Sequence, residues 1–143
     1  MPRFPSREWV EAAIGILDED PELKLAGEGW EGDFGFVVDA EPGALEIPFV
    51  VHVVPENGRL RRFALYDDPD ELDVISPAYF ARAKYSVWKG LLTGTADPIE
   101  LLLRRKIVVR GDLQQVAERA RFKGIGHRLR ERLTTTFPDD RAG

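Results

Sequence analysis

Cysteine and histidine, the side chains most often used as nucleophiles, as bases near neutral pH and as ligands of transition metals, are scarce in this sequence. The 143 residues include no cysteine, which excludes disulfides, thiolate metal sites and cysteine nucleophiles. The two histidines, His52 and His127, are far apart and form no H-x-x-x-H or H-E-x-x-H pair for a metal ion. No serine stands in a G-x-S-x-G elbow, and there is no phosphate-binding Walker loop. We therefore expect no catalytic residue and no metal site, with His52 as a hydrogen-bonded residue of a strand.

A glycine-rich stretch, Gly27–Gly32, fits the G-x-G-x-x-G pattern of dinucleotide-binding loops. That chemistry needs a strand before the glycines and a helix after them, so that the pyrophosphate meets a helix N-terminus. Here a helical pattern precedes the glycines and a strand pattern follows. We expect a loop that enters a strand, and no cofactor.

Charge is distributed unevenly along the chain. Residues 1–80 hold 6 Lys/Arg against 18 Asp/Glu, whereas residues 81–143 hold 14 against 7, for a total of −5. Such a split indicates either a basic surface for phosphates or anionic lipid, or two halves of one fold that attract each other. The acidic runs at 18–20 and 67–73 lack the spacing of a calcium loop, and we interpret them as solvated, the second as a loop.

The basic residues of the second half gather near the C-terminus. Gly124-Ile125-Gly126 within this group is similar to the hairpin of helix-hairpin-helix DNA-binding proteins. A sequence pI near 5.1 argues against nucleic-acid binding, and a helix boundary with solvated arginines is the simpler interpretation. The basic residues concerned are Arg119, Arg121, Lys123, Arg128, Arg130 and Arg132.

Hydrophobic periodicity and turn residues predict the elements that must position these side chains. Three antiparallel strands, connected as a meander, are followed by two more strands. The predicted strands are 34–39, 47–54, 60–66, 79–84 and 106–110. Helices are predicted over 7–19 with Ser6 as cap, over 86–92, from Asp97-Pro98 onward, from Asp112 onward, and around Leu129 and Leu133.

Large apolar residues are concentrated between positions 88 and 103. Two short helices separated by Gly94-Thr95-Ala96 carry them. Because short broken helices pack less tightly than one long helix, the gap between them can be a ligand cavity. An ordinary core is the alternative. The residues are Trp88, Leu91, Leu92, Ile99, Leu101, Leu102 and Leu103.

Two stretches give the chain a family resemblance. The first is Phe4–Val10 together with Ala26–Asp33, and the second runs from Ala83 to Arg121. The second stretch contains Trp88, Leu92-Thr93-Gly94, Asp97-Pro98 and Lys106–Asp112 in that order. In these features the chain resembles the sterol carrier protein type-2 domain family, in particular its small stand-alone prokaryotic members.

The resemblance implies an α+β fold in which a five-stranded, mostly antiparallel sheet is covered on one face by about five helices and encloses an apolar tunnel. It also implies a protein without enzymatic activity that binds and transfers a fatty acid, an acyl-CoA or a similar apolar ligand. Since each buried CH₂ contributes about 0.8 kcal/mol, affinity is expected to increase with chain length. By matching elements, the residues expected to line the tunnel are Phe80, Trp88, Leu91, Leu92, Ile99, Leu102, Leu103 and Phe122.

Further expectations concern partners and organisation. We expect one domain over 1–143, a frayed tail over 138–143, a monomer or homodimer, and a cytoplasmic protein, because no signal peptide or apolar span is present. The basic C-terminal residues would contact anionic membrane, and no nucleic acid is expected. The tail is not the peroxisomal tripeptide of many eukaryotic family members, and no motif identifies the ligand's head group. An accessory or assembly module for a lipid- or quinone-processing enzyme is the alternative function.

Overall fold

A five-stranded sheet forms the centre of the molecule. The computed structural model describes residues 2–28, 30, 32–56, 59–112 and 122–139. The strand order is β3-β2-β1-β4-β5; β1 pairs with β4 in parallel, and the other three pairings are antiparallel. The predicted meander and the two added strands are therefore confirmed. The strands are β1 (Phe34–Asp39), β2 (Phe49–Glu56), β3 (Arg59–Tyr66), β4 (Tyr79–Lys84) and β5 (Ile107–Arg110).

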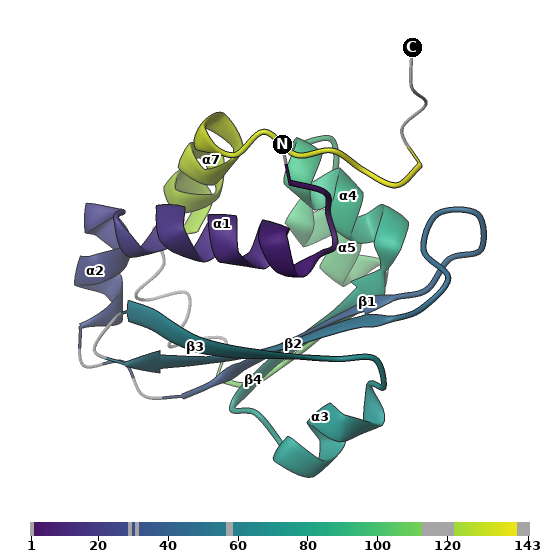
Figure 1. Ribbon diagram of the computed structural model, residues 1–143, viewed down its shortest axis with the longest axis horizontal. Helices are drawn as coiled ribbons and strands as arrows, with labels where there is room; N and C mark the ends of the chain where they lie inside the picture. The colour runs from purple at the N-terminus through teal and green to yellow at the C-terminus, as the bar shows by residue number, and fades with distance from the viewer. Residues whose placement is uncertain (1, 29, 31, 57–58, 113–121, 140–143) are drawn as a thin grey trace.

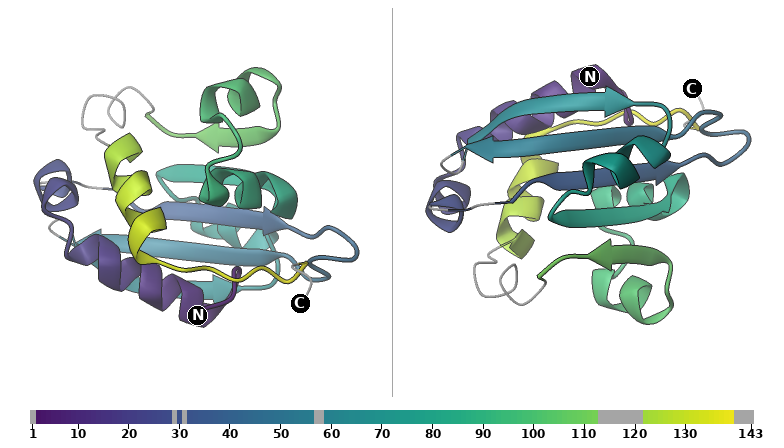
Figure 2. Two further views of the ribbon diagram at one scale, coloured as in Figure 1. Left: turned by 90° about the horizontal axis from the view of Figure 1, so that it is seen from above. Right: turned by 90° about the horizontal axis from the view of Figure 1, so that it is seen from below.

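Helices lie on both faces of this sheet, whereas the family resemblance implied a cover on one face. Helices α1, α4 and α7 lie over one face, and α3 lies against the other (Figure 1). Helix α5 lies beside the edge strand β5, at the far side of the sheet from α1 (Figure 2). The helices are α1 (Arg7–Asp18), α2 (Pro21–Gly27), α3 (Asp70–Ile75), α4 (Tyr85–Thr93), α5 (Pro98–Leu103) and α7 (Phe122–Arg132).

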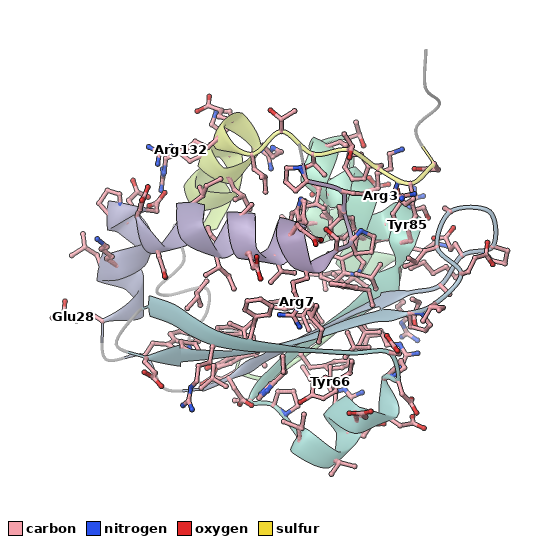
Figure 3. All side chains as sticks on the ribbon, viewed as in Figure 1. Arg3, Arg7, Glu28, Tyr66, Tyr85 and Arg132 are labelled. Atoms are coloured by element: carbon pink, nitrogen blue, oxygen red, sulfur yellow. The ribbon has the colours of Figure 1, made fainter. Side chains whose placement is uncertain are left out.

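The principal core lies between the sheet and helix α1. Alternate residues of β1 and β2 point to this face because successive side chains of a strand point to opposite sides. Val51 and Val53 of β2 are buried against Val10 of α1. The helix begins where Ser6 accepts a hydrogen bond from the Trp9 N–H, as predicted. Arg7 lies between α1 and β3, with its guanidinium 5.4 Å from the Phe63 ring centre (Figure 3).

A second, smaller core fills the space between the sheet and α3. Leu72 is 1% exposed and packs with Val37, Val50 and Phe80. Helix α3 approaches the sheet closely at Gly35, where an added Cβ would lie 3.0 Å from a Leu72 methyl carbon. The prediction of a solvated acidic loop was wrong here, because the acidic side chains face solvent around one buried leucine.

The two ends of the chain lie side by side. The Phe4 N–H donates to the Thr136 carbonyl at 2.9 Å, and the Thr136 N–H donates to the Pro2 carbonyl at 3.0 Å. Beyond them, Asp139 accepts hydrogen bonds from Tyr85 Oη at 2.7 Å and Lys89 Nζ at 2.9 Å. The segment predicted to fray is therefore held as far as Asp139, near the labelled Tyr85 in Figure 3.

Two further predictions concern the glycines at positions 124 and 126 and the helix expected to follow Asp112. Helix α7 runs unbroken through Gly124 and Gly126, so these glycines do not form a hairpin. The helix predicted to follow Asp112 falls on residues 113–121, outside the described residues. Within the part of the chain that the structure describes, no helix combines the length and apolarity needed to cross a membrane.

Candidate functional site

A pocket of about 480 Å³ opens between α4, α7 and the first turn of α1. Its volume falls in the range of about 300–1,000 Å³ that small-molecule sites occupy. Most of its wall is apolar, and four polar residues stand among the lining: Thr93, Arg130, Thr134 and Thr135. The apolar lining consists of Trp9, Trp88, Leu91, Leu92, Leu129, Leu133 and Phe137.

Helical spacing brings the apolar residues of α4 onto one face. Trp88, Leu91 and Leu92 stand at positions i, i+3 and i+4, which are neighbours on a helix surface. The indole of Trp88 is held in place because its Nε1 donates a hydrogen bond to the Val37 carbonyl of β1 at 2.9 Å. The α4 wall is therefore fixed to the sheet.

The opposite wall comes from α7 and the segment that follows it. Leu129 and Leu133 stand at i and i+4, and Leu133 is 8% exposed. Trp9 of α1 donates from Nε1 to Thr135 Oγ1 at 3.0 Å, which ties the C-terminal segment across α1. The part of this wall that follows α7 is held in place by the pairing of the two ends of the chain.

An ion pair fixes α7 beside α2. Arg128 donates from Nε and Nη2 to Asp20, at 2.5 and 2.9 Å, and its Nη2 lies 3.3 Å from Glu22. Hydrogen bonds to Asp20 and Glu22 raise the pKa of Arg128 above its ordinary value. Asp20 is 4% exposed, so the prediction of a solvated acidic run at 18–20 was wrong at this residue.

Charge complementarity between the two halves of the chain explains part of the uneven charge distribution. Besides Arg128 and Asp20, Arg82 of β4 forms a two-pronged ion pair with Asp39 of β1, with N–O distances of 2.7 to 3.1 Å. The interpretation that the two halves attract each other therefore holds for these pairs.

Seven of the eight predicted lining residues have described side chains, and these seven fall into three groups. Trp88, Leu91 and Leu92 come together in the pocket. Phe80 lies on the opposite face of the sheet, in the core under α3, with the Arg110 guanidinium 4.6 Å from its ring centre. The three residues of α5 are exposed to solvent, with exposed fractions of 68% for Ile99, 45% for Leu102 and 79% for Leu103.

The remaining predicted residues are described only in part. Phe122 begins α7, but its side chain is not among those described, and the same holds for Lys123. Arg119 and Arg121 fall outside the described residues. Arg132 lies on the outer side of α7, away from the sheet (Figure 3).

Sequence reasoning missed four apolar residues of the pocket, namely Trp9, Leu129, Leu133 and Phe137. The i, i+4 spacing of Leu129 and Leu133 was visible, but it does not indicate which surface the helix covers. Trp9 and Phe137 become neighbours only through the pairing of the chain ends.

A histidine–carboxylate pair connects strand β2 to the residue before β1, and its hydrogen bonds indicate a structural role. His52 Nε2 lies 2.6 Å from Asp33 Oδ2, and the Ala78 N–H donates to Asp33 Oδ1 at 2.8 Å. This agrees with the expectation that His52 is a hydrogen-bonded strand residue. Among the described residues, no group of three histidine, cysteine or acidic side chains is placed to hold a metal ion.

Asp33 makes acid stability testable. Burial opposes its ionisation, but hydrogen bonds from the Ala78 N–H and His52 outweigh burial and lower the pKa of Asp33 below its ordinary value. A lowered carboxylate pKa contributes stability above about pH 4, which is lost as the pH falls through the folded-state pKa. We expect Asp33→Asn to lower the free energy of unfolding by about 1 kcal/mol at pH 7. We also expect the free energy of unfolding of this variant to fall less steeply as the pH is lowered. Urea unfolding of both proteins between pH 7 and pH 2 measures this dependence. An equally steep loss of stability in the variant and the unaltered protein would contradict the prediction.

The arrangement of sheet and helices is that of sterol carrier protein 2. A crystal structure of sterol carrier protein 2 superposes with a TM-score of 0.71 at 20% identity, over 90% of this chain and 98% of that one. The solution structure of a conserved hypothetical protein from Thermus thermophilus, described as possibly a sterol carrier protein, gives 0.64 at 19% identity, over 88% and 84%. Palmitated SCP2L2 from Aedes aegypti gives 0.50 at 16% identity, over 82% and 94%.

At these identities the likeness establishes the fold. The sequence matches no protein-family model and no curated protein. The predicted α+β architecture is therefore confirmed at the level of the fold.

Proposed function

We propose that this chain binds a lipid-like amphiphile, such as a fatty acid, with its hydrocarbon chain in the pocket between α4 and α7, and that it carries this ligand without chemical change. The observation that carries the proposal is the pocket itself, whose wall is seven apolar side chains interrupted by a few polar groups. A hydrocarbon chain that leaves water gains about 0.8 kcal/mol per CH₂, so each added methylene tightens binding about fourfold until the pocket is full. The sterol carrier protein 2 fold supports the same conclusion, since one solved structure of this fold is a palmitated protein.

The experiment that tests this is lipid analysis of the purified protein. Denaturing extraction followed by mass spectrometry is expected to recover a lipid, and saturated fatty acids of increasing length are expected to displace a fluorescent fatty acid with rising affinity. A protein that yields no lipid and releases no probe is not a lipid carrier. Isolation with a stable enzyme partner and a ligand-free pocket would instead favour the accessory-module alternative.

Arg130 is the residue we assign to the ligand's polar end. It lines the pocket, and it forms no ion pair with any carboxylate among the described residues. The guanidinium lies against Gly94, which ends α4 in the left-handed conformation: a Cβ at this glycine would be 3.5 Å from Arg130 Nε, an ordinary van der Waals distance. An unpaired cation at an apolar pocket favours a ligand with an anionic head.

The substitution Arg130→Gln is therefore expected to weaken binding of a fatty acid by up to about fivefold, the range of a solvent-accessible ion pair. Binding of the fatty alcohol of equal length is expected to change little, because it carries no charge. Competitive displacement of a fluorescent probe measures both ligands. Arg132→Gln is the matched control, since Arg132 belongs to the same helix but does not line the pocket. Equal losses for the two variants would contradict the assignment.

A further inference from the structure

Helix α5 exposes an apolar stripe that the pocket does not use. Ile99, Leu102 and Leu103 stand at i, i+3 and i+4, so they share one face of the helix. All three are exposed, Leu103 to 79%. The helix begins at a well-formed cap, in which Asp97 accepts a hydrogen bond from the Ile99 N–H at 2.9 Å, so the stripe belongs to an ordered element. Clustered large apolar side chains on a surface mark a site of interaction.

A run of cations follows this stripe directly. Arg104, Arg105 and Lys106 connect α5 to β5, and β5 ends at Arg110. Glu100 is the single acidic residue from Pro98 to Arg110, and it is paired with Arg104 at 2.8 Å. Among the described residues, neither Arg105 nor Lys106 forms an ion pair. Arg105 and Lys106 are therefore free of carboxylate partners in the part of the chain that the structure describes, and they can meet an anionic surface.

The backbone at the end of α5 places these cations next to the stripe. Arg105 has φ = +56°, a left-handed conformation that glycine usually adopts at the end of a helix. The Arg105 N–H donates to the Leu102 carbonyl and the Lys106 N–H donates to the Leu101 carbonyl, at 3.1 and 2.9 Å. The chain thus turns sharply and returns as β5, with the cations at the turn.

The location of α5 leaves the stripe accessible. The helix lies beside β5 at the edge of the sheet, far from α1 and α2 (Figure 2). Only the short segment 94–97 separates it from α4, which forms one wall of the pocket. The stripe is therefore only a few residues in sequence from Thr93, which lines the pocket.

We propose that α5 docks the protein on anionic lipid bilayers, with Ile99, Leu102 and Leu103 inserted among the lipids and Arg105 and Lys106 at the phosphate level. Charge complementarity decides the occupant. An apolar stripe bordered by basic residues gains from both the hydrocarbon and the charge of an anionic membrane. A two-fold contact between two copies of α5 would bring the same cations together, with one acidic residue on each side to offset them.

Vesicle binding of the full chain tests the proposal. The probes are vesicles of phosphatidylcholine alone and of phosphatidylcholine with phosphatidylglycerol, measured by sedimentation. The protein is expected to bind the anionic vesicles, and Leu103→Glu is expected to weaken this binding at least about tenfold. Val74→Glu is the matched control, because Val74 is 87% exposed on α3, the helix that packs on the other face of the sheet. This variant is expected to bind vesicles as the unaltered protein does.

A second variant separates membrane docking from folding. Arg105→Gly removes one cation and places the preferred residue at the left-handed position. It is therefore expected to retain or raise the melting temperature while weakening binding to anionic vesicles about fivefold. Fatty-acid displacement without vesicles is expected to be unchanged for Arg105→Gly and Leu103→Glu, so the docking result is independent of the proposed function.

Insertion of α5 into a bilayer can be measured with a fluorophore on one introduced cysteine, because the chain contains no cysteine of its own. A polarity-sensitive fluorophore on Leu103→Cys is expected to shift to the blue with anionic vesicles, and the same label on Val74→Cys is expected to remain unchanged. Equal responses at both positions, or undiminished vesicle binding by Leu103→Glu, would overturn the proposal. So would a dimer, detected by analytical ultracentrifugation without vesicles, that Leu103→Glu dissociates, because a second copy would then cover the stripe.

Discussion

Replacing Leu91 with tryptophan is expected to block the pocket and abolish most lipid binding. Leu91 is half-buried on the pocket face of α4 and belongs to no core cluster, so the larger side chain has the pocket volume to occupy. If the indole excludes three methylenes of the ligand, binding weakens by about 50-fold. Anisotropy of a fluorescent fatty acid, titrated with the variant, measures this loss.

Val74→Trp is the control for Leu91→Trp, because it adds the same side chain at an exposed position against the other face of the sheet. It is expected to bind as the unaltered protein does. Leu91→Trp with undiminished affinity and an unchanged melting temperature would place the ligand elsewhere in the molecule.

The largest loss of stability is expected from Leu72→Ala. Leu72 is 1% exposed and packs with Val37, Val50 and Phe80. Truncating a buried leucine removes its transfer free energy and leaves a cavity, which together cost about 2–5 kcal/mol. Urea unfolding monitored by circular dichroism gives the free energy of unfolding.

The matched control is Val74→Ala, two residues along the same helix at a side chain that is 87% exposed. A change of less than about 0.5 kcal/mol is expected there. If Leu72→Ala were equally harmless, α3 would not form a core with the sheet.

Much of the fold was predictable because its information is local. Alternation in Phe34–Asp39, the apolar run in β2 and the returning strand specify an antiparallel meander from neighbouring residues alone. The caps at Ser6 and Asp97 likewise depend on residues within one turn of the helix start. The resemblance to the sterol carrier protein type-2 domain family predicted the same architecture, which the structural comparison confirms as a fold.

The segment around Leu72 was misinterpreted because its composition is acidic. A run of aspartates and one glutamate has the average properties of a solvated loop, and one leucine does not change that average. Leu72 is buried because α3 packs against Gly35 and Val37 of β1 and against Val50 of β2. That information is not present within the segment.

The residues of α5 show the reverse error, because their apolar composition predicted burial and the structure exposes them. Ile99, Leu102 and Leu103 have the apolar composition of a cavity wall, yet they face solvent beside the edge strand. Composition predicts that such residues avoid water, but it does not determine whether a core, a ligand or a membrane covers them.

The sequence by itself determined all five strands and most of the helices, α3 excepted, because periodicity and capping act over a few neighbouring positions. It also indicated the absence of thiol chemistry, because it contains no cysteine. Tertiary structure alone decided the site. Trp9, Trp88, Leu129 and Phe137 meet around one pocket because the chain ends pair and because α7 is held to α2 by Arg128 and Asp20. Such contacts join residues more than a hundred positions apart, and no local pattern encodes them.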